Sequence, residues 1–125
     1  MHRANALAVF SVAAVILAGC SSGSASTGAT FGGDPTAGRQ AFLITCATCH
    51  GPEGKGVSGL GKDLTTSEFL RTQSDDQMLA FLLTGRPASD PLNNTGVDMP
   101  PKGGNPAFTE GDLMDIIAYL RTIQP

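Results

Sequence analysis

The chain has 125 residues, with 8 lysine and arginine residues against 11 aspartate and glutamate residues and a formal net charge of −3. This length has room for one domain, and the acidic balance argues against nucleic acid as a partner because a phosphate backbone would be repelled. The 16 glycines and 8 prolines predict long loops and short helices.

The first twenty residues have the pattern of an export signal. A short, mildly basic start is followed by an apolar run over residues 6–17, which is too short to span a bilayer. The run ends in Leu17-Ala18-Gly19-Cys20, a string that resembles the lipobox of bacterial lipoproteins. We expect residues 1–19 to be removed as a signal peptide and the Cys20 thiol to carry the lipid. The alternatives are an ordinary secretory signal with a chance cysteine after it, and an uncleaved signal anchor.

A lipidated Cys20 would hold the protein on the extracytoplasmic (periplasmic) face of a bacterial membrane. Two or three acyl chains at one point give stable anchoring, whereas a single chain is marginal. Residues 21–33 (SSGSASTGATFGG) are nearly uncharged and low in complexity. Cys20 and this segment are therefore expected to form a flexible linker over residues 20–33, followed by one folded domain over residues 34–125.

The expected domain has helical patterns and no strand alternation. Asp34 followed by Pro35 is a typical helix start, and a helix is predicted from residue 35 to about residue 46. The glycine-rich stretch 51–61 has no apolar periodicity, which predicts a loop. A short helix is predicted over residues 67–71.

Two further helices begin with capping patterns. Ser74 and Gln77 have the form of a capping box, and this helix should end before Gly85. A long loop over residues 87–108 then holds five of the eight prolines. Thr109 and Asp112 cap the last helix, which has an apolar stripe made of Leu113, Ile116, Ile117 and Leu120. Together these patterns predict an all-α domain of about four short helices and long loops.

The string Cys46-Ala47-Thr48-Cys49-His50 has the Cys-x-x-Cys-His spacing of covalent haem attachment. Two thiols three positions apart, on a chain leaving a helix, can add to the two vinyl groups of one haem. The histidine that follows is then carried beneath the iron as its proximal ligand. The string therefore predicts one covalent haem c.

Other uses of the two cysteines fit the sequence less well. A structural zinc site needs four ligands, whereas Cys46, Cys49 and His50 supply three and Cys20 is assigned to the lipid. A thioredoxin-like redox pair would accompany a βαβ pattern, which the sequence lacks. A plain disulfide in an oxidising compartment is open, but it leaves His50 unexplained.

The second axial ligand of the iron is predicted to be Met99. Once residues 1–19 are removed, His50 is the only histidine, so the remaining soft donors are Met78, Met99 and Met114. Met78 and Met114 lie on apolar faces of predicted helices, where methionine usually fills the core. Met99 precedes Pro100 and Pro101 in a polar loop, and these prolines restrict the backbone, so Pro100 is expected to help present the thioether in one pose.

His/Met ligation fills both axial positions and raises the reduction potential. Such a site relays single electrons and has no open position for oxygen or peroxide, which favours an electron carrier over an enzyme. The alternative is a haem-based sensor or a peroxidase-like enzyme, in which Met99 is not a ligand and the sixth position is open.

Over residues 34–125 the chain resembles the class I cytochromes c. The shared features, in order, are a helix leading into Cys-x-x-Cys-His, a glycine-rich loop, a mid-chain helix, a Met-Pro loop and a closing helix. The resemblance implies a small all-α cytochrome c fold wrapped around one haem. It also implies that the first and last helices cross at close range, through Gly38 and Phe42 on the first and Tyr119 and Leu120 on the last.

The chain departs from the family pattern after the glycine-rich loop. Many relatives have Gly-Pro-x-Leu there, and the carbonyl of that proline accepts the Nδ1–H of the proximal histidine. Here the stretch is Gly61-Lys62-Asp63-Leu64. The resemblance therefore implies that the backbone carbonyl of Lys62 takes this role, in a less rigid turn.

One segment has a more specific likeness. The string from Thr84 (TGRP) to Pro106 (MPPKGGNP) looks like the mono-haem lipoprotein subunits of bacterial respiratory assemblies, including alternative complex III. The resemblance implies an electron donor such as a quinol-oxidising complex, and an acceptor such as a terminal oxidase, a photosynthetic reaction centre or a soluble carrier. The protein would be either a tethered carrier between such complexes or a fixed subunit of one.

Overall fold

The computed structural model describes residues 32–125, and the predicted signal peptide, Cys20 and most of the predicted linker lie outside these described residues. In chain order the helices are α1 (Pro35–Ile44), α2 (Ala47–His50), α3 (Glu68–Thr72), α4 (Asp75–Thr84) and α5 (Glu110–Thr122), with a 3-10 turn, η1 (Pro101–Gly104), before α5. No strand occurs within residues 32–125. The all-α fold class predicted from the sequence is confirmed.

The first predicted helix is wrong at its end. The prediction ran to about residue 46, whereas α1 ends at Ile44 and a separate turn, α2, follows. Thr45 has φ −131° and ψ −53°, outside the helical region, and this breaks the helix. The start agrees with the prediction: the Asp34 side chain accepts from the backbone N–H of Thr36 at 2.8 Å, and Pro35 begins the helix.

The later helices begin at the predicted caps. Ser74 and Gln77 make a full capping box on α4, and Thr109 and Asp112 make one on α5. Hydrogen bonds from the side chain and backbone of Thr109 to the Asp112 carboxylate lower the pKa of that group. Ser67 caps α3 by accepting from the backbone N–H of Leu70. Local sequence therefore determines where these three helices start.

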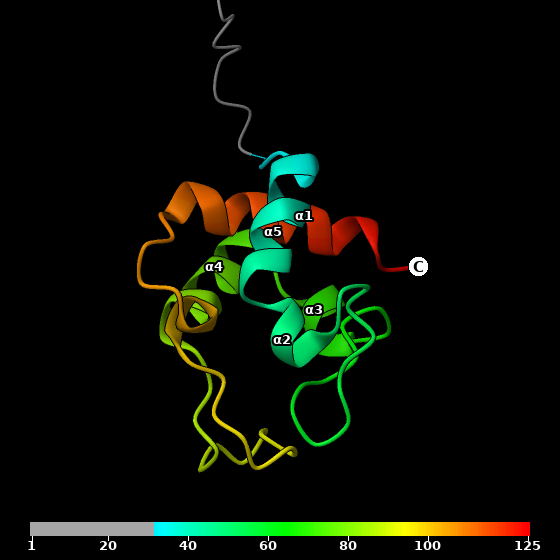
Figure 1. The fold of residues 1–125 in the computed structure, drawn as a ribbon, viewed down its shortest axis with the longest axis vertical. Coiled ribbons are helices and arrows are strands. Elements are labelled where there is room, and N and C mark those ends of the chain that lie inside the picture. Colours follow the sequence, from blue (N-terminus) through cyan, green and yellow to red (C-terminus); the bar gives the residue numbers. More distant parts are fainter. Residues whose placement is uncertain (1–31) are drawn as a thin grey trace, which may run out of the picture.

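Helices α1 and α5 cross at close range (Figure 1). A Cβ placed on Gly38 of α1 would overlap the backbone carbonyl of Asp115 in α5, so this crossing requires a residue without a side chain. Beside it, the rings of Phe42 and Tyr119 have centroids 5.3 Å apart at an interplanar angle of 57°. The backbone N–H of Asp34 also donates to the Asp115 side chain at 2.7 Å.

The core lies between α1, α3, α4 and α5. Its buried residues are Phe42, Leu70, Met78, Leu82, Phe108, Leu113, Ile116, Ile117, Tyr119 and Leu120. The four residues of the predicted apolar stripe on the last helix are all among them, and Tyr119 joins them. The two long loops, green and yellow in Figure 1, extend together from one side of this helical layer.

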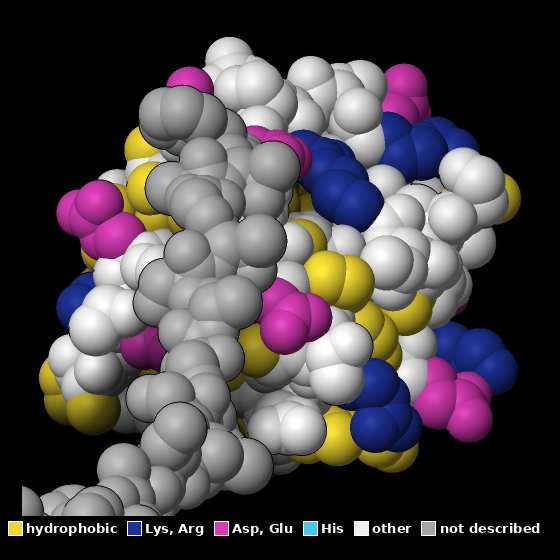
Figure 2. All heavy atoms as spheres, turned by 90° about the horizontal axis from the view of Figure 1, so that it is seen from above, with side chains coloured by type: hydrophobic (Ala, Val, Ile, Leu, Met, Phe, Trp, Pro, Cys, Tyr) yellow, Lys and Arg dark blue, Asp and Glu magenta, His cyan; other side chains and the backbone are white. Residues whose placement is uncertain are grey.

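Two surface properties of the described part bear on its surroundings. Within residues 32–125, no helix combines the length and the hydropathy that crossing a bilayer requires. Figure 2 views the face away from the long loops, where basic and acidic side chains are interspersed. This face has no extended block of one charge among its visible described residues.

Replacing Gly38 by alanine should destabilise the folded protein. The added Cβ forces α1 and α5 apart, and we expect a loss of about 1–3 kcal/mol in the free energy of unfolding, measured with denaturant. Gly111→Ala is the matched control, because its Cβ would meet only the Thr109 hydroxyl, at 3.5 Å. That change should be neutral or stabilising by up to about 1 kcal/mol. Equal effects of the two substitutions would contradict the close crossing.

Candidate functional site

A cavity lies between the helices and the two long loops. About 1200 Å³ of atom-free space lies in and above it, including space that is open to solvent. Four of the helices supply most of its apolar wall, through Phe42, Phe69, Leu70, Met78, Phe81, Leu82, Leu113, Ile116 and Leu120. Several of these residues also belong to the core, so the core and the cavity wall are continuous.

Cys46 and Cys49 lie in this wall as free thiols. Cys46 is the N-cap residue of α2 and Cys49 is within α2. Burial raises the pKa of the Cys46 thiol to about 11, and the neighbouring Cys49 adds a smaller effect in the same direction. Cys46 is therefore uncharged at neutral pH, unlike the thiolate of a redox-active pair. Within residues 32–125, no group of three or more His, Cys, Asp or Glu side chains is placed to hold a metal ion.

His50 is the last residue of α2, and its imidazole also lines the cavity. Its Nδ1 lies 2.9 Å from the backbone carbonyl oxygen of Lys62. A carbonyl can only accept, so Nδ1 carries a proton, and in the neutral imidazole Nε2 then has the free lone pair. The carbonyl acceptor that the family pattern implied at Lys62 is thus present although proline is absent. A histidine held in this way could present Nε2 to a metal.

The glycine-rich loop holds the Lys62 carbonyl in place. The backbone N–H of Gly56 donates to the carbonyl of His50 at 2.7 Å, and the N–H of Leu64 donates to the carbonyl of Gly54 at 2.7 Å. Gly56 has φ +81°, and a Cβ there would lie 2.8 Å from the carbonyl carbon of Lys62. The loop thus folds back against His50 because glycine permits both the backbone angle and the close approach.

Met99 lies in the cavity wall, contributed by the second long loop. Its backbone pairs with that of Arg86 in an isolated antiparallel bridge. Pro100 follows it in the wall and serves as the N-cap residue of η1. A Cβ on Gly85 would overlap the Met99 carbonyl, so the end of α4 packs directly on the Met99 backbone.

The six predicted site residues within residues 32–125 all line this one cavity: Cys46, Cys49, His50, Lys62, Met99 and Pro100. Cys20 lies outside the described residues. Of the two other methionines within residues 32–125, Met78 is buried and also lines the cavity, whereas Met114 packs on the core and is absent from the wall. The convergence is tertiary, since these residues are spread over more than fifty positions of the sequence.

Sequence reasoning missed two contributors to the wall, Arg86 and Asn93. Arg86 lies against the rings of Phe69 and Phe81, and Asn93 braces the second loop through five hydrogen bonds. An Asn two residues before a Thr-Gly pair is a recognisable turn signal. No local pattern indicates the contact between Arg86 and the two rings, because these residues come from different elements.

The described residues fit a haem. Two free thiols, one imidazole and the thioethers of Met78 and Met99 surround a mostly apolar cavity. Two thiols, an imidazole and a thioether are the donor set that c-type haem uses. The sequence model of the cytochrome c family matches residues 35–124. The chain belongs to the cytochrome c family. No curated protein and no solved structure matches it significantly.

Membership of the family establishes the general function. Cytochromes c hold haem c covalently and transfer electrons through it, so this cytochrome is a haem-based electron-transfer protein. The match spans the described domain from the start of α1 to the residue before the C-terminus. The class I resemblance stated from the sequence is therefore confirmed at the level of the family.

Gly56→Ala should weaken the support of His50 more than Gly59→Ala does. Both glycines have positive φ, +81° and +75°, but only Gly56 packs on the backbone of residues 61–63, while Gly59 has open space around it. We expect G59A to cost about 1–2 kcal/mol in unfolding free energy and G56A roughly twice that. NMR exchange of the His50 Nδ1 proton with solvent should be faster in G56A alone. Equal exchange in both variants would contradict this role of Gly56.

Proposed function

We propose that this cytochrome carries one covalent haem c, ligated by His50 and Met99, and transfers single electrons while anchored by lipid on the extracytoplasmic face of a bacterial membrane. The observation that supports it best is the convergence of Cys46, Cys49, His50 and Met99 on one mostly apolar cavity. Cys46, Cys49 and His50 are neighbours in the sequence, whereas Met99 is distant from all three.

In this proposal the two thiols bind the porphyrin and the two ligands bind its iron. Cys46 and Cys49 hold the macrocycle by thioether bonds, and His50 presents Nε2 with its ring oriented by the Lys62 carbonyl. When bound, the haem supplies a reversible one-electron couple at its iron. The apolar side chains of the wall keep water from the iron and provide a low-dielectric surrounding.

Ligation of the iron by Met99 distinguishes an electron carrier from an enzyme in this proposal. Its thioether, as sixth ligand, closes the iron to oxygen and peroxide and raises the reduction potential. The Arg86–Met99 bridge and the contact of Gly85 with the Met99 carbonyl support this assignment, because both restrict the backbone that presents the thioether. Met78 also lies in the wall, but at 2 % exposure it serves as core packing.

Absorption spectra of the haem-loaded protein without residues 1–20 test the ligand assignment. We expect a methionine-to-iron charge-transfer band in the ferric form and no response of the ferrous form to carbon monoxide. Met99→Leu should abolish the band and open the site to carbon monoxide, whereas Met78→Leu, which conserves volume at the other wall methionine, should keep both properties. Rapid carbon monoxide binding by the unmodified protein would instead favour a haem sensor or a peroxidase-like enzyme.

The membrane anchor and the partners rest on the sequence. The string Leu17-Ala18-Gly19-Cys20 and the low-complexity segment after it support a lipid tether. The string between Thr84 and Pro106 supports work beside a quinol-oxidising complex, including alternative complex III, with a terminal oxidase, reaction centre or soluble carrier as acceptor. The cytochrome would be a swinging carrier or a fixed subunit of that assembly.

Cell fractionation tests the lipid anchor, and native gels test whether the protein is a free carrier or a subunit. The unmodified protein should sediment with membranes, and Cys20→Ser should move it to the soluble periplasmic fraction, because its acyl anchor is lost. After mild detergent extraction, a carrier runs alone on native gels and a subunit co-migrates with quinol-oxidising components. Failure of the unmodified protein to incorporate labelled palmitate, with Cys20→Ser as the unlabelled control, would refute lipid anchoring at this residue.

A further inference from the structure

The segment that presents Met99 is a loop whose two ends are joined. The backbone N–H of Arg86 donates to the carbonyl of Met99 at 2.8 Å, and the N–H of Met99 donates to the carbonyl of Arg86 at 2.8 Å. The twelve residues between them form a compact surface loop with its ends in contact. A shift of the Arg86 backbone is therefore transmitted directly to Met99.

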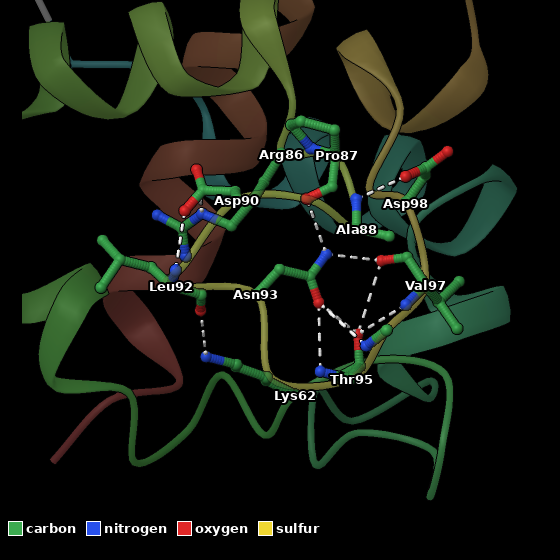
Figure 3. A network of polar contacts seen from close by, with 11 residues as sticks. Lys62, Arg86, Pro87, Ala88, Asp90, Leu92, Asn93, Thr95, Val97 and Asp98 are labelled. Atoms are coloured by element: carbon green, nitrogen blue, oxygen red, sulfur yellow. Dashed lines mark hydrogen bonds and ion pairs between the residues drawn. The ribbon is translucent and has the colours of Figure 1, made fainter.

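The interior of this loop is braced by Asn93 (Figure 3). Its Nδ2 donates to the carbonyls of Pro87 at 3.1 Å and Val97 at 2.8 Å. Its Oδ1 accepts from the Thr95 N–H and hydroxyl and from the Gly96 N–H, at 3.0–3.1 Å. These bonds hold the loop together, but they do not attach it to the helices.

The Arg86 side chain adds a contact with both α3 and α4 to the packing of Gly85 on the Met99 backbone. Its guanidinium carbon lies 4.6 Å from the ring centroid of Phe69 on α3 and 4.8 Å from that of Phe81 on α4. The two rings contact each other edge to face, with centroids 4.9 Å apart, so the three groups form a triangle. The carboxylate of Asp90, within the loop, lies 3.6 Å from the Arg86 Nε, an ion-pair distance without a hydrogen bond.

We propose that Arg86 is a positioning residue for Met99, and that it fixes the ligand loop to α3 and α4 by packing its guanidinium into the notch between Phe69 and Phe81. This inference rests on the proposed function, in which Met99 ligates the iron. In this proposal the position of Met99 is restricted by a residue thirteen positions earlier in the sequence.

Burial alone does not explain an arginine in this position. The Arg86 side chain is 14 % exposed, and its Nε is buried without a hydrogen-bond partner among the described residues. An apolar side chain would fill the notch without leaving that donor unpaired. A planar, delocalised cation, however, can lie on both ring faces and still pair with Asp90, which an alkyl chain or a compact ammonium cannot do.

Imidazole binding to the ferric, haem-loaded protein tests the proposal, because imidazole must displace Met99 to reach the iron. Arg86→Met keeps the volume and loses the charge, while Arg86→Lys keeps the charge and loses the planar fork. Both should bind imidazole more tightly, on the order of tenfold, as expected when a partly desolvated cation–π contact is lost. Both should also have lower reduction potentials, because thioether ligation raises the potential.

Arg71→Met is the matched control, since Arg71 is an exposed cation of α3 that does not line the cavity. Its imidazole affinity should stay within about twofold of the unmodified protein, because exposed charges are screened by solvent. Wild-type behaviour of Arg86→Lys would overturn the proposal, since charge alone would then suffice. Unchanged affinity in both Arg86 variants would overturn it as well.

Met99→Leu, measured in parallel, separates this proposal from the proposed function. If that variant loses the methionine-to-iron band but the Arg86 variants bind imidazole as the unmodified protein does, only the role of Arg86 fails. If Met99→Leu keeps the band, the ligand assignment fails, and the role of Arg86 fails with it. Should Arg86→Met not accumulate, Arg86→Lys carries the comparison alone, because it retains both charge and length.

Discussion

The contact between Gly38 of α1 and the Asp115 carbonyl of α5 is the constraint on which the remaining arrangement depends. It brings two helices from opposite ends of the domain close enough for Phe42 and Tyr119 to pack together. Those two helices form one wall of the cavity, through Phe42 on one side and Leu113, Ile116 and Leu120 on the other. A wider crossing would open this wall to water and separate the start of the Cys-x-x-Cys-His string from the core.

The two residues proposed as iron ligands are held by different kinds of interaction. His50 is oriented by one hydrogen bond to a backbone carbonyl, which a glycine-rich loop carries back to it. Met99 is held by a two-bond backbone bridge to Arg86, whose side chain is packed between aromatic rings. Lys62 links the two sides, because its carbonyl accepts from His50 while its ammonium donates to the Leu92 carbonyl at 3.3 Å (Figure 3). The lysine that replaces the family proline thus adds a contact that proline lacks.

Much of the fold could be predicted because its signals are local. The caps at Asp34, Ser74 and Thr109 involve residues within four positions of one another, and each was found where the sequence indicated. The break at Thr45, where the backbone leaves the helical region, was missed because no proline or glycine marks it in the sequence. The Arg86 notch was missed for a related reason: its two rings come from α3 and α4, and no periodicity joins them to the loop.

By itself the sequence determined the chemistry of this protein: the spacing of Cys46, Cys49 and His50 specifies how a haem can be attached, and capping and periodicity specify helices. These are short-range properties, set by covalent geometry and by hydrogen bonds within one or two turns. Only the tertiary structure decided which residues meet around the cavity, and that the Lys62 carbonyl reaches His50. Such meetings depend on how elements distant in the chain pack together, and packing is resolved only when all of them are in place.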